Sequence, residues 1–379
     1  MEDKNPASNE FCLLERLPEA VLLKILFRLP INSIIKLKLV CRWLHMILCR
    51  LDFTLNYSKN SPFSTLFLPD DYEDVSYLYL LEISDGSRCF RTMFRPKIPD
   101  WSESDDLGLS VVGTCGNGLV GIALYKCLTE IVYICNPITG ECDQVAEHKV
   151  KEGGERCTVK YGFGFCRSTN NYKVLKIVST SSGGTPKSIK GEILTVGVDE
   201  TWRVLANTTI PFSFVPLGSV NLNDALHWLP CDSHSTWILT FDLGEEKAGR
   251  ISYPPGLEKT TIDMKLLSRN NQLCFIYHSV GTSIVMWRMK AYGVAESWTK
   301  DMVLDIPVSS QWGLAEYSIV TILGNGDILL SHTWEEKYTY SYNPTRRKFT
   351  RIEARECYGL IDYSPSFSSL EELIKGGHW

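Results

Sequence analysis

The stretch "VVGTCGNGLVGIAL" (residues 111–124) places a Gly-Asn-Gly turn between two short apolar runs. This pattern predicts a β-hairpin, because asparagine and glycine tolerate the positive φ angles that tight hairpin turns require. Similar hairpins recur along the chain at intervals of 48 to 54 residues, and their turn asparagines are Asn117, Asn170, Asn223, Asn271 and Asn325. A repeat of about 50 residues that consists of short strands indicates the blades of a β-propeller.

Each hairpin is followed by a third strand and a more polar fourth strand, such as "IVYICNP" and "GECDQV" after the first hairpin. Five four-stranded blades are therefore expected from about residue 109 to residue 353. Further strand-like runs lie before these blades ("FSTLFL", "VSYLYLLEI", "CFRTMFR") and after them ("CYGLIDYS"). We expect these runs to combine into a sixth blade, which would close the ring and remove its open edges.

Two other arrangements of the strands stay open at this point. Seven blades would result if the N-terminal strands formed a unit of their own. A stack of two β-sandwiches would also use short alternating strands. The six-bladed propeller, closed by N- and C-terminal strands and preceded by helices, is the preferred prediction, which makes the chain an α+β multidomain protein.

The N-terminal stretch "LERLPEAVLLKILFRLPINSIIKLKLVCRWLHMIL" (residues 14–48) has helical rather than strand periodicity. Leu22, Ile25, Leu26 and Leu29 follow the i, i+3, i+4, i+7 pattern of a one-faced helix. Pro30 ends this helix, and two more short helices are expected with a bend near residues 38–40. Three such helices are too few to enclose a core. Their remaining apolar face should pack on the rest of the chain or on a partner.

The charge of this helical stretch differs from that of the body. Residues 14–50 carry seven basic and two acidic side chains, a net charge of +5, and the whole chain has −5, which leaves −10 elsewhere. A basic, apolar segment on an acidic body favours docking to an acidic partner. The mild overall charge argues against nucleic-acid binding. Basic residues interrupt every apolar window, so we expect no membrane span.

The cysteines and the motifs of possible catalytic chemistry give a non-enzymatic prediction. The 13 cysteines are odd in number, scattered and without C-x-x-C pairs, which favours reduced thiols in a cytoplasmic or nuclear protein. "GNGLVG" (residues 116–121) is followed by a strand rather than the helix that a dinucleotide site needs. His227, Cys231 and His234 lack a fourth zinc ligand. We therefore expect no catalytic residue, no metal and no cofactor.

Two resemblances add a functional prediction. Leu17-Pro18, "ILFRLP" and "LVCRWLHMIL" make residues 14–48 similar to an F-box. "TCGNGLVGI", "ICNPITGE", "YGFGFCRSTNNYKVLKI", "ALHWL", "FDLGEEK" and "MKAYGVAESWTK", in this order, resemble the plant F-box-associated domain. The expected domains are a disordered N-terminus (1–11), an F-box (12–55), a propeller (60–366) and a short C-terminal helix (367–379). Ser369 and Glu372 fit a capping box for that helix, for which we expect a surface role.

The resemblance implies a substrate receptor that joins a Skp-family adaptor and, through it, a cullin–RING ubiquitin ligase. The residues expected to share adaptor contact and internal packing are Leu17, Pro18, Leu22, Ile25, Leu26, Leu29, Pro30, Leu37, Val40, Cys41 and Trp43. The target protein is unknown. Candidate recognition loops are residues 147–157, 179–188 and the stretch around Val215, although residues 179–188 also fit an ordinary flexible linker. The alternative is a propeller enzyme or ligand-binding protein that the helices merely cap.

Overall fold

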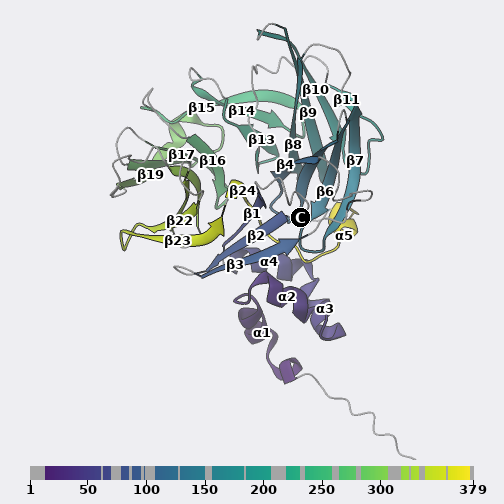
Figure 1. Cartoon of the computed structure of the whole chain (residues 1–379), viewed down its shortest axis with the longest axis vertical. Helices are drawn as coiled ribbons and strands as arrows, with labels where there is room; N and C mark the ends of the chain where they lie inside the picture. The colour runs from purple at the N-terminus through teal and green to yellow at the C-terminus, as the bar shows by residue number, and fades with distance from the viewer. Residues whose placement is uncertain are drawn as a thin grey trace, which may run out of the picture.

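A computed structural model gives the fold of the chain. It describes residues 13–60, 63–69, 78–84, 88–94, 98, 107–126, 129–149, 156–182, 185–205, 219–230, 235–257, 264–278, 283–305, 317–323, 326–332, 338–355 and 357–375. In this structure a small helical domain sits at the margin of a ring of β-sheets, below the strands β2 and β3 (Figure 1).

The N-terminal domain consists of short helices: η1 (Leu13–Arg16), α1 (Glu19–Leu26), α2 (Ile31–Leu37), α3 (Arg42–Leu48) and α4 (Leu51–Asn60). The three helices expected from the sequence are present as α1, α2 and α3. Pro18 and Pro30 occupy the N-cap positions of α1 and α2, where no backbone N–H is needed. The chain breaks between α2 and α3 at residues 38–41, as predicted. The additional helix α4 leads directly towards the first strand.

Five sheets are each built from four consecutive antiparallel strands. The first blade consists of β4 (Leu107–Thr114), β5 (Val120–Lys126), β6 (Thr129–Asn136) and β7 (Glu141–Lys149), and the second of β8 (Arg156–Cys166), β9 (Asn171–Ser182), β10 (Thr185–Thr195) and β11 (Arg203–Val204). The third blade consists of β12 (Val220–Leu222), β13 (Ala225–Trp228), β14 (Trp237–Asp242) and β15 (Lys247–Ser252), and the fourth of β16 (Met264–Arg269), β17 (Gln272–His278), β18 (Ser283–Met289) and β19 (Trp298–Asp305), with η2 (Ala295–Ser297) before β19. The fifth blade consists of β20 (Tyr317–Ile322), β21 (Ile328–His332), β22 (Tyr338–Asn343) and β23 (Lys348–Arg355).

A composite sheet combines strands from both ends of the chain in the order β24-β1-β2-β3. Its strands are β24 (Cys357–Asp362), β1 (Phe63–Pro69), β2 (Leu78–Ser84) and β3 (Arg88–Phe94). The expected pairing of N- and C-terminal strands therefore occurs, with Thr65 opposite Asp362. The sequence analysis counted this combination as a sixth blade. That count is corrected to five blades of consecutive strands, and the terminal strands form one composite sheet.

The turn asparagines adopt the backbone conformation that the sequence predicts. Asn170, Asn223 and Asn271 have φ angles of 56°, 50° and 58°. In the first blade Gly118 takes the positive φ, at 89°, and a Cβ there would approach the backbone nitrogen of Ser366 to 2.6 Å. Asn325 lies outside the described residues. The described turns thus each contain at least one residue with positive φ, because each must reverse the chain between the first two strands of a blade.

The alternation of antiparallel strands divides the ring into two faces. The first and third strands of each blade end on one face, which we call the turn face, and the second and fourth strands end on the opposite face. In the composite sheet β24 and β1 take the places of the first and second strands of a blade, and they pair in the same antiparallel way. β24 therefore ends on the turn face, and β1 begins there. The helical domain precedes β1 and therefore joins the ring at its turn face.

The C-terminal helix has the predicted cap, but it is more deeply buried than the sequence analysis expected. The capping box of α5 (Leu370–Lys375) is present, since Glu372 N donates to Ser369 Oγ (3.2 Å) and Ser369 N donates to Glu372 Oε2 (3.1 Å). However, Leu370 and Leu373 are almost fully buried. The prediction of a surface role was wrong, because these two leucines fill a core between the first two blades.

Candidate functional site

The inner face of the helical domain is a continuous apolar core. Its buried members come from all four α-helices and pack against the composite sheet and the first blade. The apolar residues of these helices with relative exposure of at most 2% are Leu22, Leu26, Ile31, Ile34, Leu44, Leu48, Phe53 and Tyr57. The helices therefore do bury their inner apolar face against the rest of the chain, one of the two outcomes that the sequence analysis left open.

On its outer side the helical domain also exposes large apolar side chains, which no described residue of the chain covers. We call this the exposed apolar face: Val21, Ile25, Leu39, Val40 and Met46. Leu39 is 84% exposed, Val40 64% and Met46 61%. These five residues are half of the ten large apolar side chains that are exposed in the described parts of the chain. Such a concentration in one small domain is typical of an interaction surface.

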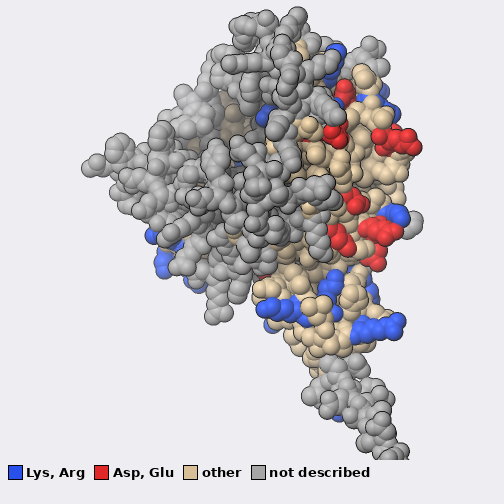
Figure 2. All heavy atoms as spheres, turned by 45° about the vertical axis from the view of Figure 1, so that its right-hand side comes forward, with Lys and Arg blue, Asp and Glu red and all other residues tan. Residues whose placement is uncertain are grey.

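The helical domain also carries exposed basic side chains. Lys24, Lys36 and Arg42 are exposed on α1, α2 and α3, and Arg28 is exposed in the turn after α1. In Figure 2 the lower, helical part of the surface carries Lys and Arg, whereas Asp and Glu gather on the sheet region above it. The separation of charge that the sequence predicted is therefore present in the folded molecule. An acidic partner with an apolar strip would complement this surface.

The structure separates the residues that the sequence grouped together as adaptor contacts. Leu22 and Leu26 are buried at 1% and 2% exposure, so they stabilise the domain from inside. Pro18, Ile25 and Val40 are exposed. The remaining predicted residues are partly buried: Leu17, Leu29, Pro30, Leu37, Cys41 and Trp43. Cys41 is also the N-cap of α3, where its Sγ accepts a hydrogen bond from Leu44 N at 3.5 Å.

The sequence analysis missed Val21, Leu39 and Met46. Val21 and Met46 do not belong to the apolar stripes that define the buried sides of α1 and α3. Leu39 lies in the break between α2 and α3, where helical periodicity gives no direction for a side chain. One signal was available for Val21 and Met46: they are large apolar residues at helix positions that the apolar pattern assigns to solvent.

A buried carboxylate attaches the helical domain to the composite sheet. Glu82 on β2 has no exposed surface, and its two oxygens accept the backbone N–H of Ile31 at 3.0 and 2.9 Å. The Tyr57 hydroxyl donates to Leu29 O at 2.9 Å and lies 3.5 Å from Glu82 Oε1. The carboxylate thus caps the first turn of α2 from another domain. Burial raises the pKa of Glu82 to about 7, against the lowering effect of the Ile31 hydrogen bond.

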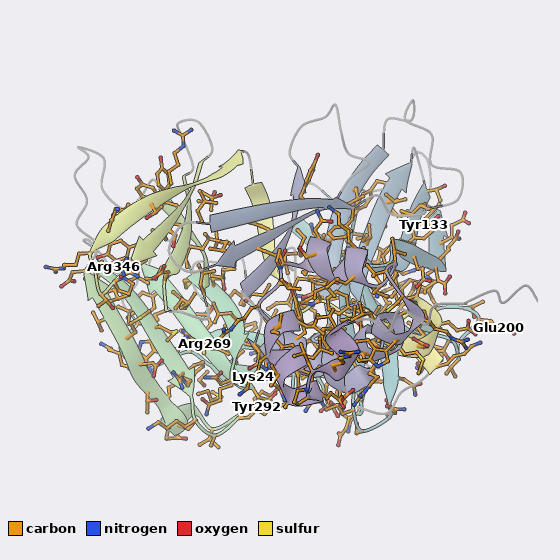
Figure 3. The ribbon with its side chains drawn as sticks, turned by 90° about the horizontal axis from the view of Figure 1, so that it is seen from below. Lys24, Tyr133, Glu200, Arg269, Tyr292 and Arg346 are labelled. Carbon is orange, nitrogen blue, oxygen red and sulfur yellow. A yellow bond between two sulfur atoms is a disulfide. The ribbon has the colours of Figure 1, made fainter. Side chains whose placement is uncertain are left out.

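The C-terminal stretch before α5 attaches the helices at a second place. Phe367 is fully buried, and its ring lies edge-on to Tyr57 with centroids 5.1 Å apart. Phe53 completes this aromatic cluster, 5.8 Å from Phe367. Seen from below, the helices that carry Lys24 lie in front of the ring with side chains crowded around them (Figure 3).

The motifs that suggested catalytic or metal chemistry have structural roles where the structure describes them. The "GNGLVG" turn leads into β5 and not into a helix. The ring nitrogens of His227 bond to Val220 O (3.0 Å) and to the Tyr292 hydroxyl (2.8 Å). Burial lowers the pKa of His227 to about 4. Cys231 and His234 lie outside the described residues, and among the described residues no group of metal-ligating side chains comes together.

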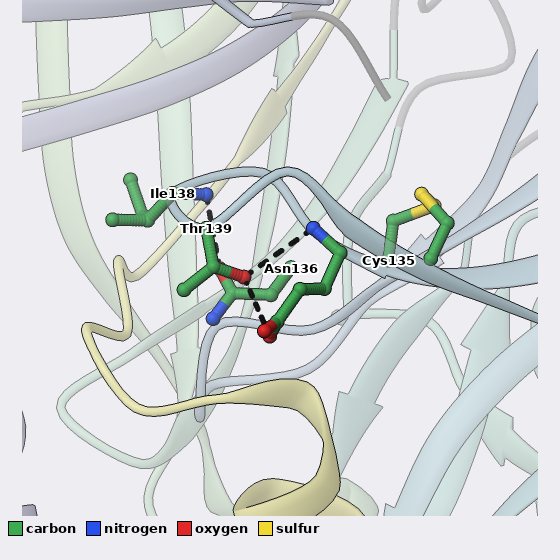
Figure 4. Close-up of a disulfide and its surroundings, with 6 residues drawn as sticks. Cys135, Asn136, Ile138 and Thr139 are labelled. Carbon is green, nitrogen blue, oxygen red and sulfur yellow. Dashed lines mark hydrogen bonds between the residues drawn. A yellow bond between two sulfur atoms is a disulfide. The ribbon is translucent and has the colours of Figure 1, made fainter. Parts of the chain in front are cut away.

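One pair of cysteines differs from the expectation of reduced thiols. Cys135 on β6 and Cys142 on β7 stand opposite each other and form a disulfide. The bridge closes the base of a turn in which Asn136 Oδ1 accepts the N–H of Ile138 at 2.9 Å (Figure 4). The sequence analysis interpreted Cys135 as a small apolar residue because it lies in an apolar run, but its cross-strand neighbour decides its chemistry.

The described helices are too short or too polar to cross a membrane. This finding agrees with the charge pattern of the N-terminal stretch, in which basic residues interrupt each apolar run.

Comparison with known proteins gives the family. Residues 14–55 match the F-box domain and residues 103–365 match the F-box associated beta propeller domain. The chain therefore belongs to the F-box proteins that carry an F-box-associated β-propeller. It is 29% identical to the F-box protein At3g07870 of Arabidopsis thaliana over 89% of this chain and 87% of the relative. It is 24% identical to the F-box/kelch-repeat protein At3g23880 of the same plant, over 83% of this chain and 84% of the relative.

Similar solved structures include TolB from Acinetobacter baumannii, with a TM-score of 0.45, 11% identity, and coverage of 80% of this chain and 66% of that one. The SapL1 lectin in complex with alpha methyl fucoside has a TM-score of 0.37 and 9% identity, and the alignment covers 79% of this chain and 97% of the lectin.

Proposed function

We propose that this chain is the substrate-recognition subunit of an SCF-type cullin–RING ubiquitin ligase. The F-box would dock on a Skp-family adaptor, and the propeller would bind a target protein. In this role the chain is not an enzyme, because the active centre of ubiquitin transfer belongs to another protein of the complex. Its place of action would be the cytoplasm or the nucleus.

The observation that carries the proposal is the exposed apolar face of the F-box. Val21, Ile25, Leu39, Val40 and Met46 together present apolar area to solvent in a domain that is already fully packed on its inner side. Covering such area with a partner removes it from water, at about 25 cal/mol per Å². The exposed basic side chains of the same domain support an acidic adaptor, because opposite charges speed association and orient the two partners.

The arrangement of strands supports a recognition role for the opposite face of the propeller. Two of the candidate loops connect strands on that face: residues 147–157 run from β7 into β8, and residues 179–188 join β9 to β10. Residues 179–182 and 185–188 are paired strand ends, with Ser182 opposite Thr185, so they form a hairpin rather than the flexible linker that the sequence also allowed. Residues 150–155 and Val215 lie outside the described residues.

This geometry would let both partners bind at once. The adaptor would occupy the outer side of the F-box, which is attached to the turn face, and the target would occupy the opposite face. Holding the target in the same complex as the catalytic subunits raises the effective concentration of its lysines. Nucleic acid and membrane are not expected partners.

The test is adaptor binding by the double variant Leu17→Ala/Pro18→Ala, in full-length protein. We expect pull-down of a Skp-family adaptor to be lost while the propeller still melts cooperatively. Retained adaptor binding by a folded double variant would contradict the proposal. Comparing proteins that accumulate when residues 1–55 are deleted would then identify the target.

A further inference from the structure

The chain from the end of β24 to the start of α5 contacts the F-box and the first blade at the same time. We call residues 363–370, which include the first residue of α5, the strap. On the F-box side, Lys38 Nζ donates to Phe367 O at 2.7 Å. Phe367 N donates to Thr54 Oγ1 at 3.5 Å, and Ser368 Oγ donates to Cys49 O at 3.4 Å. These three bonds join the strap to the turn after α2, to α4 and to Cys49, the C-cap of α3.

The other side of the strap is held by two turns of the first blade. Asn136 Nδ2 donates to Ser366 O (3.1 Å) and to Ser368 O (2.8 Å). Leu370 N donates to Glu141 Oε2 at 2.6 Å. The Tyr363 hydroxyl donates to Gly118 O at 3.1 Å. Asn136 and Glu141 flank the turn that the Cys135–Cys142 bridge closes, shown with α5 below it in Figure 4.

Burial makes this connection stiff. Tyr363, Ser366, Phe367 and Ser368 are each at most 5% exposed. Buried polar groups that lose their partners are costly, at about 1–3 kcal/mol each. Rotation of the F-box away from the ring would break several such bonds together with the Phe53–Tyr57–Phe367 cluster. It would also remove the Glu82 carboxylate from the Ile31 N–H.

We propose that the strap, with Phe367 as its central positioning residue, and Glu82 fix the F-box in one orientation on the propeller. The inference rests on the proposed ligase function, which it deepens. A fixed orientation would hold the bound target at one distance and angle from the ligase's active centre. Ubiquitin transfer would then reach a restricted set of lysines instead of every lysine within the length of a flexible linker.

The orientation can be measured on the full chain without adaptor or target. Distance labels are introduced through noncanonical amino acids at Lys24 on the F-box and Arg346 on the β22–β23 turn; both positions are exposed and both are labelled in Figure 3. The unmodified strap should give a single narrow distance distribution. Phe367→Ala should at least double its width. Phe367→Leu keeps a large apolar side chain at this position. Its distance distribution should be nearly as narrow as that of the unchanged chain.

A matched control uses the same C-terminal stretch. Leu373 is as buried as Phe367 but packs between the first two blades and not against the F-box. Leu373→Ala should lower the melting temperature without widening the distribution. Equal widths for Phe367→Ala and the unchanged chain would overturn the proposal, and so would widening by Leu373→Ala alone.

If Phe367→Ala does not fold, Lys38→Ala provides the second variant. Lys38 lies at the edge of the F-box, so its loss removes the bond to Phe367 O without opening the core. A distribution that stays as narrow as that of the unchanged chain would contradict the proposal. Adaptor pull-down with each folded strap variant separates the two ideas: we expect affinity within about twofold of the unchanged chain, because the exposed apolar face is untouched. Lost adaptor binding by the unchanged chain would instead contradict the ligase function.

Discussion

The inner and outer sides of the F-box both carry large apolar side chains, but those on the inner side are buried and those on the outer side are exposed. On the inner face, Leu26 and Ile34 pack into a core that extends into the composite sheet. On the outer face, Ile25 and Leu39 project into solvent. Since hydrophobicity is the same on both sides, it cannot be what distinguishes them. The difference is whether a surface of the same chain is available to cover each face.

The largest expected effect compares two neighbours on α1. Leu26→Ala should lower the free energy of unfolding of the F-box by about 2–5 kcal/mol, because it leaves a cavity in a packed core. Ile25→Ala should change that free energy by less than about 0.5 kcal/mol but weaken adaptor binding. Chemical denaturation and calorimetric titration with adaptor measure the two quantities. Similar loss of stability in both variants would break the comparison.

A second prediction concerns the pH dependence of the inner attachment. The pKa of Glu82 is raised in the folded state to about 7, above its value in the unfolded chain. Its stabilising contribution is therefore fully present below about pH 4.5 and is lost as the pH rises through 7. Glu82→Gln cannot titrate, so the stability of the wild-type chain relative to this variant should fall by about 2 kcal/mol between pH 5 and pH 8.

Thermal melts of both proteins across this pH range make the measurement. The comparison between the two proteins cancels the titration of other groups, such as His227. A stability difference that is independent of pH would show that Glu82 does not change its protonation state on folding.

The disulfide gives a smaller effect at the turn that holds the strap. Cys135 and Cys142 are separated by seven positions in sequence, so their bridge closes a short loop, and reduction should lower the free energy of unfolding by about 2 kcal/mol or less. Melting temperatures with and without reductant test this. The matched control is the double variant Cys135→Ala/Cys142→Ala, in which the response to reductant at this site should be absent.

The smallest effect is expected for exposed apolar residues on the propeller. Val198 and Val204 are 66% and 71% exposed, but they lie on the second blade and not on the F-box. Val198→Lys and Val204→Lys should change both stability and adaptor affinity by less than about 0.5 kcal/mol. A large loss of adaptor binding in either variant would show that the docking surface is not confined to the helices.

The repeat in the sequence predicted the blades well, because each hairpin depends on local turn chemistry. Asn170 and Asn223, for example, have positive φ at the turns between the first two strands of their blades. The sequence did not predict α4, since its residues include "NYSKN" and have little helical periodicity beyond Phe53 and Tyr57. Periodicity also identified the inner stripe of α1 correctly as apolar. It could not predict which apolar residues of the F-box would be buried against the propeller and which would stay exposed.

The attachment between the domains was not predictable from local patterns. "SPSFSS" before α5 has the composition of a loop, and Phe367 becomes buried only because residues more than 300 positions earlier surround it. The same is true of Glu82, an acid in an apolar strand that bonds to Ile31 in another domain. The burial of Phe367 also depends on closure of the ring by β24, which brings the two ends of the chain together.

The central claim is that the outer face of the F-box binds the adaptor. The most direct measurement is the affinity of a purified Skp-family adaptor for the full chain and for Leu39→Asp/Val40→Asp. Both side chains are mostly exposed, so the variant should melt at the same temperature as the unchanged protein. We predict an affinity loss of at least about 100-fold, or roughly 3 kcal/mol. Unchanged affinity in a folded double variant would contradict the account.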